Sequence, residues 1–211
     1  GAESIYDALE ISNICPYCGS NQVTEAHDVN TLAPGGVCAF AITAKQAGEN
    51  FKQWLKRKWF CPKEAKESAK AENFKGVYLP FWTFDANTVS TYTAQYGKNR
   101  TVRGKDGKNQ IVTDWYPTRG TYSEFIDDQL VAGSDQHDEK TMRAIEPFDT
   151  KSNKTYRPEY IAGFISERYS IGLKKAWEKA KAYIYERLLN AISQKVRAEH
   201  YADDVRDVRL N

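Results

Sequence analysis

The sequence has little of what usually reveals an enzyme. It contains no G-x-x-x-x-G-K-[ST] phosphate-binding loop, no G-x-S-x-G nucleophile turn and no H-E-x-x-H zinc-protease motif. None of its 3 histidines stands in such a pattern. These absences exclude the nucleotide-driven motors and the hydrolases that depend on those motifs, and we predict no catalytic residues.

Long apolar runs and a signal peptide are also missing. The longest apolar stretch, Val77–Phe84, is far shorter than the roughly 18–20 residues that span a bilayer. With only 4 cysteines in 211 residues, the chain is not a secreted disulfide framework. We therefore predict a cytoplasmic protein. Because the sequence opens with Gly1-Ala2 and no methionine, we expect it to be a piece of a longer protein.

The composition that remains is that of a folded chain with a sheet. Hydrophobic residues make up 41% and aromatic residues 13%, which favours aromatic sheet faces over a plain helical bundle. The net charge of +2 argues against a strong nucleic-acid binder.

The middle of the chain predicts an antiparallel β-meander. Gly76–Phe84 is its strongest strand and is apolar on both faces, so we expect a central position, with a bulge or an edge on one side at Pro80, which cannot donate to the ladder. The strand continues through Thr88–Tyr96, and Asp106-Gly107 is typical of a hairpin turn. A further strand is expected at Ile111–Tyr116, and a strand or extended segment at Thr121–Val131. Val37–Ile42 predicts a short buried strand, and Asp204–Leu210 an extended segment.

Helices are expected on both sides of this sheet. Thr43 and Gln46 form a capping-box pattern that begins one helix, and Pro62 begins a second that ends near Asn73. A long helix is predicted from about Ser170 to His200. Its apolar stripe is Leu173, Trp177, Ala180, Ile184, Leu188, Ala191, Ile192 and Val196.

Cys15-Pro16-Tyr17-Cys18-Gly19 is the one stretch whose residue types and spacing specify a chemical task. Two thiolates on a tight turn form half of a tetrahedral zinc site, and Gly19 permits the positive φ of such a turn. An inert reduced pair and a redox Cys-x-x-Cys remain alternatives, although no strand precedes the motif in a βαβ setting.

The other zinc ligands have two possible sources. Within the chain the candidates are His27, Cys38 and Cys61, each of which is also explained as a loop histidine or a small buried residue. Gly1-Ala2, however, is what commonly follows a second knuckle cysteine. We therefore expect the missing pair immediately upstream of this chain and a structural zinc that is incomplete or absent without it.

Charge is distributed unevenly along the chain. Lysine and arginine outnumber glutamate in residues 43–75, interleaved with Trp54 and Trp59. This block predicts either a solvated helical face or a surface for nucleic acid or a partner; the candidate residues are Lys52, Lys56, Arg57, Lys58 and Lys63. An acidic block fills residues 121–139, where we expect a solvated edge or an ionic partner for the basic block more readily than a cation site.

The order of the motifs resembles that of a bacterial group of zinc-ribbon proteins labelled as similar to primosomal protein N′ (replication factor Y), a superfamily II helicase. The resemblance rests on Cys15–Gly19, Leu32–Val37, the Phe51–Pro62 region and Gly76–Asp85. It implies an upstream knuckle and a further strand beyond residues 202–211. It also implies that a membrane link would come only from segments outside this chain. Helicase activity is not expected, because the nucleotide-binding motifs are missing.

Together these observations predict an α+β fold. An antiparallel β-meander sheet would be packed by a long C-terminal helix and a preceding helix pair, with an N-terminal zinc-ribbon half. Residues 1–36 would be the zinc-ribbon remnant and a loop, and residues 37–211 an α+β domain, truncated at both ends. The expected function is a non-enzymatic binding or scaffold module that contacts a protein partner. The alternative is a DNA-binding accessory protein of replication or repair. No small-molecule substrate is inferred.

Overall fold

The structure is a computed structural model that describes residues 10–14, 21–23, 34–58, 70, 74–104 and 107–211. The chain forms two compact units. The first is made of Gly1–Phe81 and Ala132–Gly172, and the second of Trp82–Val131 and Leu173–Asn211. The predicted boundary near residue 36 stays a prediction, since residues 24–33 lie outside the described part.

Two small sheets belong to the first unit. The larger has the order β2-β1-β8-β4, in which β1 is antiparallel to β2 and β8, and β4 is parallel to β8. Its strands are β1 (Glu10–Ile14), β2 (Asn21–Val23), β4 (Val77–Tyr78) and β8 (Ile165–Glu167). The smaller pairs β3 (Gly36–Val37) with β7 (Lys154–Thr155).

The helices of the first unit begin at side-chain caps. Helix α1 (Ala44–Lys56) starts with the predicted capping box, because Thr43 accepts from the Gln46 N–H and Gln46 accepts from the Thr43 N–H. Asp138 caps α3 (Glu139–Ala144) in the same way, by accepting from the Thr141 N–H. Two single 3-10 turns, η2 (Thr150–Ser152) and η3 (Pro158–Tyr160), complete this unit.

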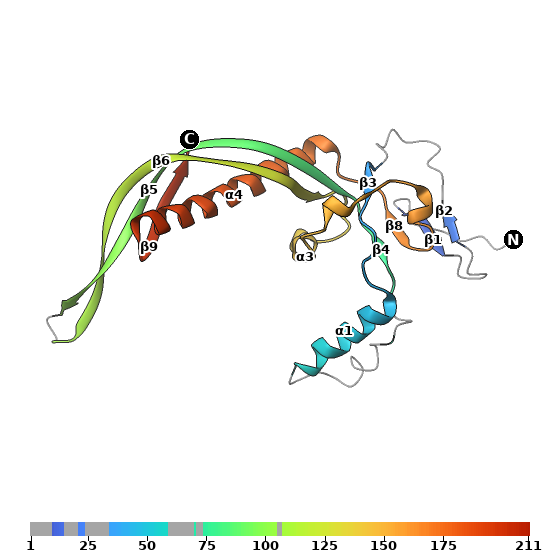
Figure 1. Ribbon diagram of the computed structural model, residues 1–211, viewed down its shortest axis with the longest axis horizontal. Coiled ribbons are helices and arrows are strands. Elements are labelled where there is room, and N and C mark those ends of the chain that lie inside the picture. Colours follow the sequence, from blue (N-terminus) through green and yellow to red (C-terminus); the bar gives the residue numbers. More distant parts are fainter. Residues whose placement is uncertain (1–9, 15–20, 24–33, 59–69, 71–73, 105–106) are drawn as a thin grey trace. The chain divides into compact units, whose positions relative to one another are not determined.

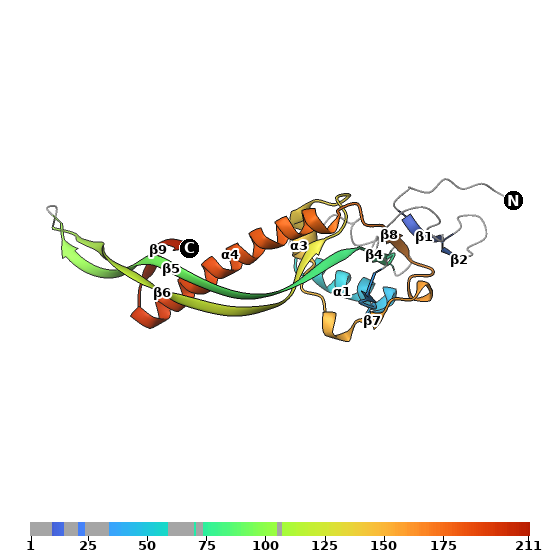
Figure 2. The same cartoon turned by 90° about the horizontal axis from the view of Figure 1, so that it is seen from above.

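A long hairpin and a long helix make the second unit (Figure 1). Strands β5 (Phe81–Arg103) and β6 (Asn109–Ala132) form the hairpin, and β9 (Asp204–Leu210) adds to the other side of β5. Helix α4 (Leu173–His200) lies along the inside of the curve that these strands describe. The turn-bearing end of the hairpin continues past the end of α4 (Figure 2).

The core of the second unit lies between α4 and one face of the sheet. Tyr92 and Ala94 of β5 pack with Ile192 and Val196, and Ile126 of β6 packs with the preceding turns of α4. The buried residues of α4 recur at every fourth position: Ala176, Ala180, Ile184, Leu188, Ile192 and Val196. Each such step turns about 40° around the helix axis. The apolar stripe therefore winds around α4, which suits a twisted sheet that wraps the helix.

Mixed helix and strand, antiparallel sheets and the C-terminal helix are confirmed, and several details are corrected. The run Val37–Ile42 is not a strand beyond Val37, and Ile42 is exposed. Gly76–Phe84 is not one central strand. Its first part, β4, is an edge strand, and the strand is interrupted at Pro80. The Pro80 carbonyl accepts a hydrogen bond from the Gly133 N–H at 2.7 Å. The second helix of the predicted pair, at residues 62–73, lies almost entirely outside the described residues.

Two further corrections concern the second unit. The strands expected at Ile111–Tyr116 and Thr121–Val131 are one strand, β6. Pro117 does not interrupt it because β6 is an edge strand, where a missing N–H can face solvent. The buried stripe of α4 begins at Ala176, while Leu173 and Trp177 are exposed.

Candidate functional site

The predicted zinc knuckle falls between two paired strands. Ile14 at the end of β1 pairs with Asn21 at the start of β2, so the antiparallel strands bracket residues 15–20. Cys15 and Cys18 themselves lie outside the described residues, as do His27 and Cys61. Their predicted roles stay predictions.

Cys38 is the one candidate ligand that the structure describes. Its half-buried thiol lies 3.8 Å from the carbonyl oxygen of Asp149, which it contacts as a weak donor. Within the described ranges, no cluster of three or more histidine, cysteine or acidic side chains includes this residue. Because the other candidate ligands lie outside the described residues, the two predicted roles of Cys38, zinc ligand or small buried residue, stay predictions.

The basic surface predicted on α1 is exposed. The side chains of Lys52, Lys56, Arg57 and Lys58 all lie at the surface; Lys63 lies outside the described residues. Trp54 is 52% exposed, and the Lys58 Nζ lies 5.1 Å from its ring centroid. Trp54 thus adds an exposed aromatic ring to the basic surface.

The acidic block is divided among several local roles. Glu124 forms an ion pair with Arg187 of α4, at 2.6 Å, rather than with the basic block. Asp135 accepts from the Ser170 hydroxyl. Asp138 caps α3, and its hydrogen bonds from the Thr141 amide and hydroxyl hold its pKa below the ordinary range.

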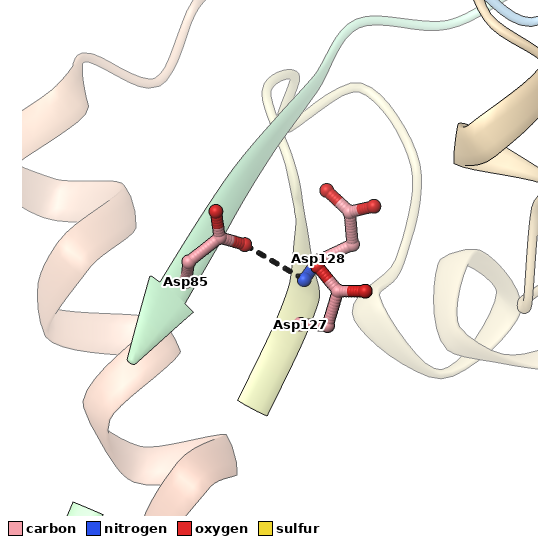
Figure 3. A group of neighbouring side chains, drawn as sticks. All are labelled: Asp85, Asp127 and Asp128. Carbon is pink, nitrogen blue, oxygen red and sulfur yellow. Dashed lines mark hydrogen bonds between the residues drawn. The ribbon is translucent and has the colours of Figure 1, made fainter. Parts of the chain in front are cut away.

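Three aspartates do meet on the second unit (Figure 3). Oxygens of Asp85, Asp127 and Asp128 lie within 4.8 Å of one another. Asp128 has a positive φ of 51°, and its N–H donates to Asp85 Oδ1 at 2.9 Å. This irregularity in β6 places consecutive carboxylates beside Asp85. The sequence did not predict that Asp85 joins this group, because Asp85 is distant in the chain from the acidic block.

The outer face of the three-stranded sheet, which points away from α4, is a surface that sequence reasoning missed. Val89 of β5 is 76% exposed and Phe125 of β6 is 58% exposed. Thr88, next to Val89, donates to the Glu124 carbonyl, next to Phe125, at 2.7 Å. The two apolar side chains are thus diagonal neighbours on this face. The signal for this exposed face was the alternation of apolar and polar residues along β5, because α4 covers only one face of the strand.

Comparison with known proteins gives one similar protein and no family. The chain is 26% identical over 184 residues to the uncharacterized protein YdjG of Bacillus subtilis (strain 168). The match covers 80% of this chain and 52% of YdjG, so the chain spans about half the length of that relative. No protein-family model and no solved structure matches. No helix in the described ranges is long and apolar enough to cross a bilayer.

Proposed function

We propose that this chain is a non-enzymatic binding module, carrying a structural zinc ribbon, that contacts a protein partner through the outer face of the sheet in its second unit. The observation that carries the proposal is the exposure of Val89 and Phe125 as neighbours on that face. Large apolar side chains that lie near each other in solvent mark protein-interaction surfaces more often than single exposed ones do. Their polar surroundings, such as Thr91 and Thr121, suit the rim of an interface.

The experiment is co-purification of the full-length protein with its partner from the native cell. We expect a protein that co-purifies in a fixed ratio with the wild type and is lost from V89D/F125D. A matched control, I111D/Y201D, replaces two other exposed apolar side chains of the same unit and should keep the partner. Equal retention by both variants would contradict the proposed surface.

The zinc ribbon is part of this proposal. Its support is the antiparallel pairing of β1 and β2 on either side of Cys15–Cys18, because a two-cysteine turn between paired strands presents both thiolates to one ion. Metal analysis of a version extended upstream should find one zinc per chain, and C15S/C18S should lose it. The absence of zinc from such an extended chain would contradict this part of the proposal.

A second candidate function is DNA binding through α1. The exposed Trp54 beside Lys56, Arg57 and Lys58 favours it, since phosphate contacts from cations together with an aromatic ring suit nucleic acid. Retention on DNA should fall steeply with salt and disappear when Lys56, Arg57 and Lys58 are changed to glutamate. Unchanged retention, or none at low salt, would exclude this function.

A further inference from the structure

Arginine side chains gather on the outer face of the sheet, toward the turn-bearing half of the hairpin. Val205, Val208 and Leu210 of β9 pack into the core. Arg206 and Arg209 therefore extend to the opposite face, and both are exposed.

A third arginine joins them from β6. Tyr96 and Tyr116 stack across the hairpin with ring centroids 5.4 Å apart, on the side that faces α4. Counting along the two strands from this pair places Arg119 opposite Thr93, on the outer face. Thr93 pairs on its other side with Arg209. The two arginines thus flank Thr93 across three strands, about 10 Å apart at the backbone.

Trp115 adds an aromatic platform beside them. The Arg206 guanidinium lies over its ring, with Cζ 3.9 Å from the centroid, and Arg206 Nε donates to Gln95 Oε1 at 3.0 Å. Gly97 leaves the space for this ring, since a Cβ there would lie 3.2 Å from Trp115. The exposed Arg206 side chain therefore lies over the Trp115 ring, a contact that a planar guanidinium favours.

Positive charge predominates in the sequence of this end of the hairpin. Residues 98–119 carry Lys98, Arg100, Arg103, Lys105, Lys108 and Arg119 against Asp106 and Asp114. Lys98 and Arg100 are engaged elsewhere, by the Tyr201 carbonyl and by Asp114. Among the described residues, the side chains of Arg119 and Arg209 make no hydrogen bond or ion pair. Two carboxylates of β9 are engaged by other arginines: Asp204 lies 3.5 Å from Arg197, and Asp207 lies 3.5 Å from Arg206.

We propose that Arg119, Arg206, Arg209 and Trp115 form a binding site for single-stranded nucleic acid. Free guanidinium groups bind phosphates through paired hydrogen bonds, and the stacked Arg206–Trp115 pair offers a plane for an unpaired base. The neighbouring Thr93 and Gln95 are polar, which suits a nucleic-acid interface better than the apolar centre of a protein interface. The site shares the outer face of the sheet with Val89 and Phe125, but its proposal does not rest on either function proposed above.

Fluorescence anisotropy of the full chain with labelled oligothymidylate and oligouridylate of about 20 nucleotides tests the site. R119A/R209A should weaken binding about tenfold and reduce the slope of log Kd against log salt by about 1.4, because two phosphate contacts are lost. R119K/R209K should restore the slope but only part of the affinity, since lysine lacks the guanidinium fork. Tighter binding of one oligonucleotide would identify RNA or DNA as the natural ligand.

Two control variants separate this site from general charge effects. K174A/K175A removes two exposed positive charges from the start of α4 and should bind as the wild type does. V89D/F125D should also keep oligonucleotide binding, whatever its effect on a protein partner. The site is refuted if no oligonucleotide binds at low salt, or if K174A/K175A loses as much affinity as R119A/R209A. Loss only on charge reversal of α1, or stronger binding of polyglutamate through the same arginines, would equally overturn it.

Discussion

Individual side chains in this protein contribute very differently to the free energy of unfolding, and the contribution of each depends on how deeply it is buried. Ile192 is fully buried between α4 and the sheet, whereas Ile111 near the hairpin turn is 74% exposed. At Glu146, burial disfavours the charged form of the carboxyl group and raises its pKa. The positive charge of Arg143 offsets this increase only in part.

Replacing Ile192 by alanine should lower the free energy of unfolding by about 2–5 kcal/mol. The change removes apolar atoms from the cluster of Tyr92, Ala94 and Val196, and leaves a cavity there. Ile111→Ala removes the same atoms from an exposed site and should change stability by less than about 0.5 kcal/mol. Denaturant titration of both variants measures the difference, and equal losses would show that the cluster is not the core.

Glu146→Gln should stabilise the protein at pH 7. Burial raises the pKa of Glu146 above its ordinary value of 4.5, so the charged form is less favourable in the folded chain than in the unfolded one. The wild type carries this cost above the raised pKa and loses it as the pH falls below 4.5. Thermal midpoints should therefore differ at pH 7 and converge near pH 4; a difference that does not depend on pH would contradict this cause.

At the scale of elements, the ends of helices and the unsupported parts of strands set local stability. Helix α1 buries only Gly48 and Leu55, so its N-terminal cap carries a large share of its stability. The hairpin of β5 and β6 is covered by α4 and joined by β9 only over part of its length, since β9 pairs with residues from Tyr92 to Gly97.

Thr43→Ala should destabilise α1 by about 1 kcal/mol, because the Gln46 amide loses its acceptor. Amide exchange at Gln46 should accelerate accordingly. Lys45→Ala, one residue into the helix, replaces an exposed residue by a strong helix former and should leave this exchange rate nearly unchanged. An unaltered rate in Thr43→Ala would mean that the capping box does not hold the helix start in solution.

Amides of residues 98–103 and 109–114 should exchange faster than those of residues 86–94. Residues 98–103 and 109–114 lie where the hairpin extends past α4 as a two-stranded ribbon, and such ribbons are only marginally stable alone. Residues 86–94 belong to the part of the hairpin that α4 covers. Hydrogen-exchange mass spectrometry reports both, and equal protection would indicate that another contact supports the end of the hairpin.

The whole molecule has two units, and each has buried residues of its own. Met142 and Ile161 are buried in the first, and Ile192 and Val196 in the second. The units are not consecutive in sequence, because the chain enters the second unit at Trp82, leaves it after Val131 and returns at Leu173.

Core changes should therefore act within their own unit. Met142→Ala should accelerate amide exchange in α3 and β8 while leaving α4 protected, and Ile192→Ala should do the reverse. Exchange mapped across both variants tests this. If either change loosens both units to the same extent, the protein unfolds as one cooperative body.

The sequence by itself determined the elements whose signals are local. Thr43 and Gln46 specify the start of α1 through hydrogen bonds four residues or fewer apart, and the repeated apolar residues up to Val196 specify α4. It predicted a bulge or an edge at Pro80, but it could not show that Pro117 lies on an edge strand and leaves β6 unbroken, nor that β4 and β5, on either side of Pro80, belong to different sheets. Those outcomes depend on which strand lies alongside, and that is set by contacts far apart in the chain.

The candidate surfaces divide in the same way. Cys15 and Cys18 predict a zinc half-site from the sequence alone, because the signal is the spacing of two neighbouring cysteines. The surface around Val89 and Phe125, and the site of Arg119 and Arg209, exist only because antiparallel pairing brings their strands together while α4 covers the opposite face. Alternation along a strand shows that two faces differ, but only the tertiary structure decides which face remains in solvent.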